Sequence, residues 1–97
     1  MFLGKVIGTV WSTKKDENLV GAKFLIVREL SLDLKEKERF VVAVDSVGAG
    51  DGEVVLVATG SSSRQTEFTK DKPVDAVIMA IVDKLDVSVR KMLEEKD

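Results

Sequence analysis

The chain has 97 residues, which is enough for one domain and too short for two of ordinary size. It carries 15 Lys and Arg against 17 Asp and Glu, a formal net charge of -2, and it contains neither cysteine nor histidine. These counts exclude disulfides, thiolate or imidazole metal sites and histidine-based catalysis, and the slightly acidic balance argues against nucleic acid or an anionic membrane as partner.

The sequence contains no stretch that is apolar enough to span a membrane. Its longest unbroken apolar run, Ala76 to Val82, has seven residues, whereas a spanning helix needs about 18. Gly4 and Lys5 follow the first three residues, so the chain lacks the apolar start of a secretory signal peptide. Together with the absence of cysteine, these features lead us to expect a cytoplasmic protein.

Short runs of β type separated by turn residues begin at the N-terminus. The first expected strand covers residues 2–11, in which Gly4 and Gly8 share a face. Two glycines placed in this way indicate a sharp bend or the close approach of another backbone, as at a barrel corner. A polar loop over residues 12–21 then leads to a second strand over residues 22–30.

The same pattern continues through the middle of the chain. Residues 31–39 carry mixed charges that are typical of a solvated hairpin loop. A third strand is expected over residues 40–44 and a fourth over residues 53–59, with a glycine-rich loop over residues 45–52 between them.

Helical signals flank the last expected strand, which covers residues 74–82. Serines at 61–63 precede Arg64 to Glu67, and Ser63 is placed to cap one helical turn there. A turn over residues 70–73 leads into the strand. A helix is expected over residues 89–96, with Asp86 or Ser88 as its N-cap.

Five short strands with glycine-bearing bends and a helical turn before the last favour an all-β fold, a small five-stranded barrel of the OB type. A sandwich of two sheets is the alternative that the spacing leaves open. We expect one domain over residues 1–97, with the barrel over about 1–83 and a helical C-terminal tail over about 86–97.

The fourth and fifth expected strands are apolar on both faces. In the fifth, Val77, Met79 and Ile81 face one way, and four further apolar residues face the other. A chain of this length cannot bury both faces of two strands in its own core, and burying one exposed Val or Ile is favourable by about 1.5–3 kcal/mol. We therefore expect an obligate oligomer that packs β surface on β surface. The alternative is that the C-terminal helix covers one face.

The glycine-rich loop invites comparison with a dinucleotide-binding fingerprint. Gly48 and Gly50 match its first two glycines, but Glu53 stands at the third position and a strand follows in place of a helix. We interpret the loop as a tight turn whose glycines adopt positive φ or allow backbones to crowd together. In a ring oligomer, such a loop is suited to a symmetry axis.

The other polar residues form no recognisable catalytic set. The carboxylates without a histidine partner are Asp45, Asp51, Glu53 and Asp75, and nothing in the sequence brings two of them together for glycosidase or Mg²⁺ chemistry. Ser61 to Ser63 beside Arg64 favour a cap and an ion pair across an interface over an anion site. Aromatic residues, at 5%, are too sparse for base stacking and are expected as core or interface anchors. We expect no cofactor and no metal.

Five segments, in order along residues 4–83, resemble the bacterial microcompartment vertex proteins, which occur in carboxysomes and in ethanolamine, propanediol and glycyl-radical compartments. The segments are GKVIGTVWSTKK from Gly4, LVGAKFLIV from Leu19, VAVDSVGAGDGEVVLV from Val42, TGSSSR from Thr59 and PVDAVIMAIVD from Pro73. The series is specific as a whole, although each segment alone would be weak.

The resemblance implies an OB-type barrel that forms a homo-pentamer without catalytic activity. Such pentamers close the fivefold corners of a polyhedral shell in the bacterial cytoplasm, beside hexameric shell proteins. Because sixfold packing has been described in a relative, a hexameric ring is the alternative. By position, the resemblance places Gly48, Ala49, Gly50 and Asp51 near the fivefold axis. It places Ser61, Ser62, Ser63 and Arg64 at subunit contacts, and Ser63 stands where the family often has Ala.

Two other functions compete with a shell role. An OB-type module that binds nucleic acid or a small ligand would need a basic or aromatic groove, and the sequence shows neither. An enzyme would have to use the glycine loop, which lacks a phosphate-binding motif. We therefore expect a structural shell protein, with Val77, Met79 and Ile81 contributing apolar surface to subunit contacts.

Overall fold

The computed structural model describes residues 1–12, 15–60, 63, 65–66, 69 and 74–87. Its elements are β1 (Phe2–Val10), the 3-10 helix η1 (Glu17–Leu19), β2 (Phe24–Leu30), β3 (Glu36–Asp45), β4 (Val54–Thr59) and β5 (Ala76–Ile81). Among these residues, no helix is long and apolar enough to cross a membrane. The helix expected over residues 89–96 and most of the helical turn expected at 64–67 lie outside the described residues.

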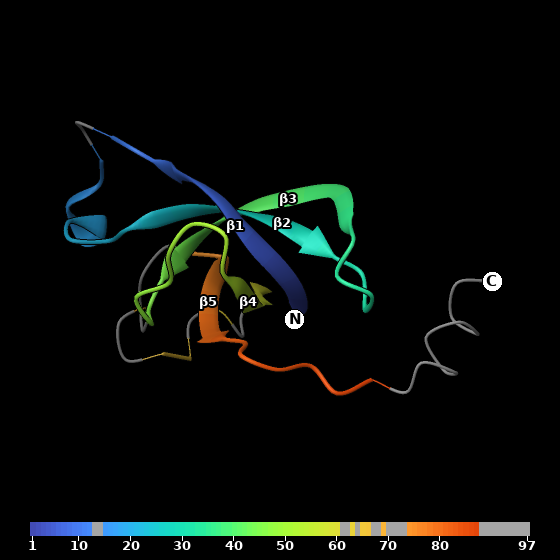
Figure 1. The fold of residues 1–97 in the computed structure, drawn as a ribbon. Coiled ribbons are helices and arrows are strands. Elements are labelled where there is room, and N and C mark those ends of the chain that lie inside the picture. The colour runs from blue at the N-terminus through green and yellow to red at the C-terminus, as the bar shows by residue number, and fades with distance from the viewer. Residues whose placement is uncertain (13–14, 61–62, 64, 67–68, 70–73, 88–97) are drawn as a thin grey trace.

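The strands close into one barrel in the order β1-β2-β3-β5-β4 (Figure 1). Every neighbouring pair is antiparallel except β3 and β5, which run parallel. This closure confirms the predicted five-stranded all-β barrel and excludes the two-sheet sandwich. Because each strand has a neighbour on both sides, a short chain satisfies most of its strand hydrogen bonds without a second sheet.

The predicted loop over residues 31–39 is wrong in its second half, because β3 begins at Glu36. The β2–β3 ladder extends from Phe24 opposite Val44 to Leu30 opposite Glu36. Arg28 on β2 donates from its guanidinium to the carbonyls of residues 37 and 38, and Glu29 pairs with Lys37 and Arg39. Charged residues are compatible with a strand here, since this part of the hairpin faces solvent.

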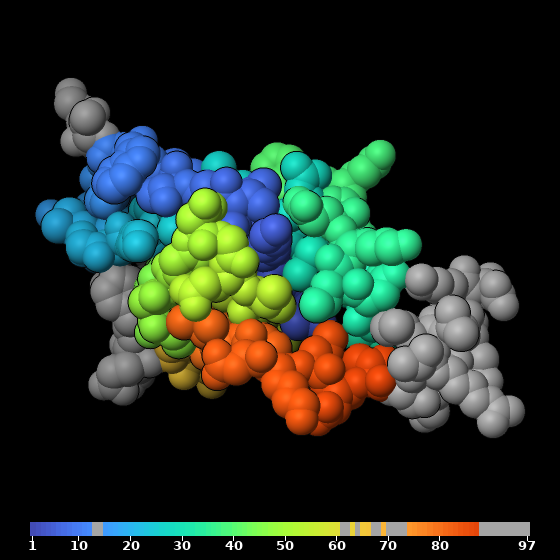
Figure 2. Space-filling model, in the orientation of Figure 1, coloured from blue at the N-terminus to red at the C-terminus, as the bar shows by residue number. Residues whose placement is uncertain are grey.

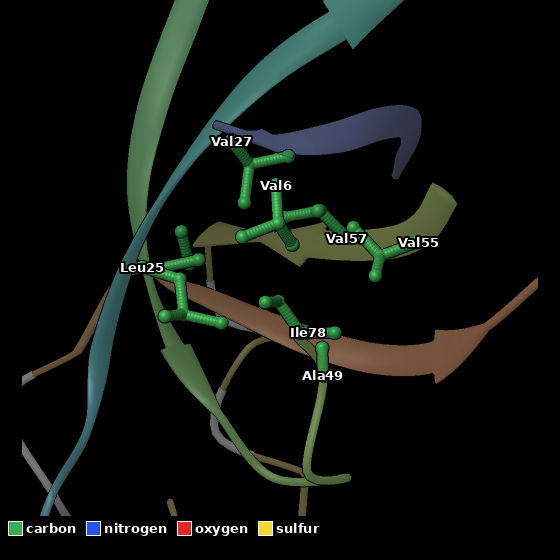
Figure 3. Close-up of a cluster of buried hydrophobic side chains, with 9 residues drawn as sticks. Val6, Leu25, Val27, Ala49, Val55, Val57 and Ile78 are labelled. Carbon is green, nitrogen blue, oxygen red and sulfur yellow. The ribbon is translucent and has the colours of Figure 1, made fainter. Parts of the chain in front are cut away.

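The barrel interior is filled by alternating apolar residues from all five strands and by one residue of a loop (Figure 3). Leu25 and Val27 point inward from β2, and Val55 and Val57 point inward from β4. The complete cluster consists of Val6, Leu25, Val27, Ala43, Ala49, Val55, Val57, Ala76 and Ile78. This is the packing that a period of two along each strand predicts.

A second buried cluster covers the other face of part of the barrel wall. It consists of Ala22, Val44, Ala58, Val74 and Val77, with Leu19, Phe24 and Met79 packed against it. The expectation that a chain of this length cannot bury both faces of β4 and β5 is therefore wrong at one end of these strands. There, the segments that flank β2 and β5 supply the covering residues.

A β-bulge in β5 changes which residues share a face. Val57 lies opposite Ile78 and Leu56 lies opposite Ala80, which leaves Met79 as the extra residue. Beyond the bulge, Ile81 packs against the barrel core. The predicted common face for Val77, Met79 and Ile81 is thus wrong for Ile81, because one extra residue reverses the alternation.

Strand β1 carries a similar irregularity between Val6 and Gly8. Gly4 and Gly8, which we expected on one face, therefore lie on opposite faces. The predicted close approach is confirmed at Gly4, where an added Cβ would lie 2.3 Å from Val27 Cγ1. An added Cβ at Gly8 would lie 3.4 Å from Ile26 Cδ1, an ordinary contact.

Residues 82–87 continue past β5 along the barrel surface. Val82 donates its N–H to the carbonyl of Val54. Leu85 and Val87 then line an open hollow of about 230 Å³ with Leu32 and Leu34 of the turn between β2 and β3. In Figure 2, the orange end of this segment lies beside the residues of that turn.

Candidate assembly surfaces

The glycine-rich loop is organised by a carboxylate at the end of β3. Asp45 Oδ1 accepts hydrogen bonds from the backbone N–H groups of Val47, Gly48 and Ala49 at 3.1, 3.1 and 3.2 Å. Gly48 has φ +77, as the sequence predicts for a turn that only glycine enters without strain. The Asp45 side chain thus fixes the first half of the loop.

A second carboxylate fixes the other half of the loop. Glu53 Oε1 accepts a hydrogen bond of 2.6 Å from the N–H of Gly50. Gly52, at φ +83, donates its N–H to the carbonyl of Val6, and Val6 donates back to the carbonyl of Glu53. The loop is therefore attached to β1 and holds a defined shape without a ligand.

The four residues predicted near the fivefold axis differ in what they expose. Gly48 and Asp51 are exposed, and Gly50 is partly exposed. Ala49 is 1% exposed, and its methyl group points into the barrel core (Figure 3). Ala49 therefore anchors the loop from inside, and the surface that the loop presents is formed by its neighbours.

This arrangement leaves little for chemistry within the loop. The N–H groups that a phosphate would need are already bound by Asp45 and Glu53. Strand β4 follows the loop, whereas a dinucleotide site needs a helix at that point. Within the described part of the chain, no three carboxylates are grouped as a metal site requires.

Ser63 is the only described member of the serine and arginine group predicted at subunit contacts. Its side chain is fully buried, and its Oγ lies 2.6 Å from the carbonyl oxygen of Gly60 and 3.1 Å from that of Val74. It therefore bonds within its own chain, between the end of β4 and the approach to β5. Ser61, Ser62 and Arg64 lie outside the described residues.

The three β5 residues predicted at subunit contacts also differ in accessibility. Val77 is fully buried in the second cluster and offers no surface to a partner. Met79 and Ile81 are half-buried, and each packs partly against a cluster of its own chain. Of the predicted β5 surface, only parts of these two side chains are open.

The structure adds exposed apolar residues that the sequence analysis did not single out. Phe40 and Val42 on β3 are 57% and 45% exposed, and Trp11 at the end of β1 is 88% exposed. The signal was present in β3, where Val41 and Ala43 are apolar and lie between them in the sequence. A strand that is apolar on both faces needs a second covering surface.

Comparisons with known proteins agree with this architecture. The family model described as "Ethanolamine utilisation protein EutN/carboxysome" matches residues 1–83. The shell vertex protein GrpN of Rhodospirillum rubrum is 49% identical over 83 residues, covering 86% of this chain and 93% of the relative. The carboxysome shell vertex protein CcmL of Synechocystis is 43% identical over 97 residues, covering 100% and 97%.

Solved structures show the same likeness in three dimensions. CcmL of Gloeobacter violaceus superposes with a TM-score of 0.85 at 40% identity and covers 90% of each chain. The GrpN structure, described as a pentameric microcompartment shell protein, gives 0.83 at 46% identity and covers 91% of this chain and 100% of that one. The chain therefore belongs to the EutN/carboxysome family of microcompartment shell vertex proteins.

Proposed function

We propose that this chain is a structural shell protein whose pentamers cap the fivefold vertices of a bacterial microcompartment in the cytoplasm. The observation that carries the proposal is the agreement of the barrel, over nearly its whole length, with a relative whose structure is described as a pentameric shell protein. The exposed apolar side chains of β3 supply a physical reason for assembly, because their burial between copies is favourable.

The protein acts by shape rather than by catalysis. Asp45 and Glu53, the carboxylates that bracket the loop, accept hydrogen bonds from its backbone. Hexameric shell proteins of the same compartment are the proposed neighbours, since a vertex piece must join the flat facets around it. Gly48, Gly50 and Asp51 lie near the fivefold axis in this proposal, where small residues and a tight loop let five chains converge.

Native mass spectrometry of the purified chain tests the proposal directly. We expect a species of five times the 10.6 kDa chain mass at micromolar protein and physiological salt. A stable monomer under these conditions would contradict the proposal, and six copies would support a hexameric ring instead. Titration with single-stranded oligonucleotide is the companion measurement, and salt-dependent binding there would favour an OB-type binding module.

A further inference from the structure

A ring of more than two identical chains needs two different contact faces on each chain. When a subunit meets its neighbour head to tail, one surface of the first copy covers an unlike surface of the next. A face that pairs with its own copy gives closed dimers and no five-membered ring. The inference below rests on the proposed pentamer and asks which two surfaces meet.

The first candidate is a row of side chains across β1, β4 and β5, named here the β4 face. Leu3 lies opposite Leu56, and Leu56 lies opposite Ala80. All three are half-buried and belong to neither buried cluster. Because Val55 and Val57 point inward, Leu56 between them points outward. The β4 face is therefore an apolar patch on the outside of the barrel.

The bulge at Met79 completes this row. Without the extra residue, Ala80 would follow the alternation of Ile78 and point into the barrel. With it, Ala80 lies opposite the outward Leu56, and Ile81 takes the inward position. A small residue beside Leu56 leaves room for a side chain from another molecule.

The second candidate, the β3 face, is formed by Ile26, Phe40 and Val42. Val42 lies opposite Ile26 in the β2–β3 ladder, and Phe40 lies one step further along, with the Arg28 guanidinium 5.9 Å from its ring centroid. Phe40 and Val42 are more than two-fifths exposed, and Ile26 is half-buried. Larger side chains thus project here than on the β4 face.

The closed strand order places these two faces on different sides of the barrel. In the order β1-β2-β3-β5-β4, strand β4 lies across the barrel from the seam between β2 and β3. Figure 1 shows β2 and β3 on one side and β4 and β5 on the other. Two unlike apolar faces that point away from each other match the requirement of a ring.

We propose that the β3 face of each copy packs on the β4 face of the next copy around the pentamer. The occupant of each face is thus a second copy of this chain. Phe40 and Val42 project from one side, and the low ridge at Ala80 beside Leu56 receives them. Both faces are apolar, so their burial against each other removes exposed hydrocarbon without stranding a charge.

Cysteine cross-linking tests this pairing, because the chain has no cysteine of its own. We would prepare Val42→Cys, Leu56→Cys and the double variant, and treat each with a short bis-maleimide. The double variant should give a covalent ladder that ends at five chains, whereas each single variant should stay monomeric on denaturing gels. The matched control, Val42→Cys with Val20→Cys, places its second thiol on an exposed residue outside both faces and should give no ladder.

Each other outcome overturns the inference in a recognisable way. Dimers from a single variant would show that a face pairs with its own copy. A ladder from the Val20 control would place the contact at the loop between β1 and β2. No cross-links in the double variant would show that another segment or another shell protein covers these faces. Native mass spectrometry of the wild type, run in parallel, separates these results from failure of the pentamer itself.

Charge substitution supplies a second, independent measurement. Val42→Lys blocks only the β3 face and Leu56→Lys blocks only the β4 face, so each variant alone should lose the pentamer while its circular dichroism stays that of a barrel. Mixed together, the two variants retain one intact face each and should form a 1:1 heterodimer. A mixture that stays monomeric, or single variants that remain pentameric, would contradict the pairing.

Discussion

Single glycines in this barrel have separate physical reasons for being glycine. Gly48 and Gly52 occupy the left-handed region of backbone conformation, where a side chain is strained. Gly4 is different, because it has ordinary φ and is limited by its neighbours on β2. At Gly4 the cost of a side chain comes from packing, and it is measurable as stability.

Gly4→Ala should destabilise the barrel by about 1–3 kcal/mol, the usual cost of forcing one extra carbon into a packed interior. The added Cβ would lie 2.3 Å from Val27 Cγ1 and 3.0 Å from the carbonyl oxygen of Arg28. Urea denaturation followed by circular dichroism measures the change. Gly8→Ala is the control and should be nearly neutral, since its Cβ would meet nothing closer than 3.4 Å. Equal effects of both variants would contradict the explanation.

At the scale of elements, the connection between β4 and β5 is held at both ends by polar contacts. Gly60 donates its N–H to the carbonyl of Asp75, and the Ser63 hydroxyl lies within hydrogen-bond distance of the Gly60 and Val74 carbonyls. These bonds bring the end of β4 to the start of β5. The contacts of Ser63 are therefore within one subunit, whatever its unseen neighbours in the sequence contact.

Ser63→Ala should lower the free energy of unfolding by about 1 kcal/mol, because a buried hydrogen bond is lost and two carbonyls lose a donor. Thermal unfolding of the variant measures this loss. Ser46→Ala is the control, since the exposed Ser46 donates a bond of 2.6 Å to the Ile78 carbonyl and water replaces it at smaller cost. Loss of the pentamer with unchanged subunit stability would instead assign Ser63 to a subunit contact.

For the whole molecule, the glycine loop connects the structure of one subunit to the symmetry of the ring. The N–H of Gly50 binds Glu53 Oε1, and a Cβ at Gly50 would lie 3.3 Å from that oxygen. A carboxylate at position 50 would repel Glu53 within the chain. In the proposed pentamer, it would also repel four copies of itself around the axis.

Gly50→Asp should therefore shift the equilibrium from pentamers towards monomers at low salt, with partial recovery at high salt as the charges are screened. Sedimentation velocity at two salt concentrations measures this shift. Gly50→Asn has nearly the same shape without the charge, and we expect a clearly smaller effect from it. If Gly50→Asp assembles as well as Gly50→Asn at low salt, the loop does not lie at the axis.

Much of this protein is determined by local patterns in the sequence. Alternation in β2 and β4 predicts the inward side chains Leu25, Val27, Val55 and Val57 because a strand has a period of two. Glycines before and after Asp51 predict a tight loop, since only glycine enters the left-handed region without cost. The order of the motifs also identified the family, which the match over residues 1–83 confirms.

Other features were decided only when distant strands met. The bulges at Ile7 and Met79 arise from the pairing of closed strands, and they reverse which residues face inward. The inward position of Ala49 and the covering of Val77 depend on segments far away in the chain. A period of two describes one strand at a time, whereas barrel closure sets the register between strands, and register decides which apolar residues remain on the outside.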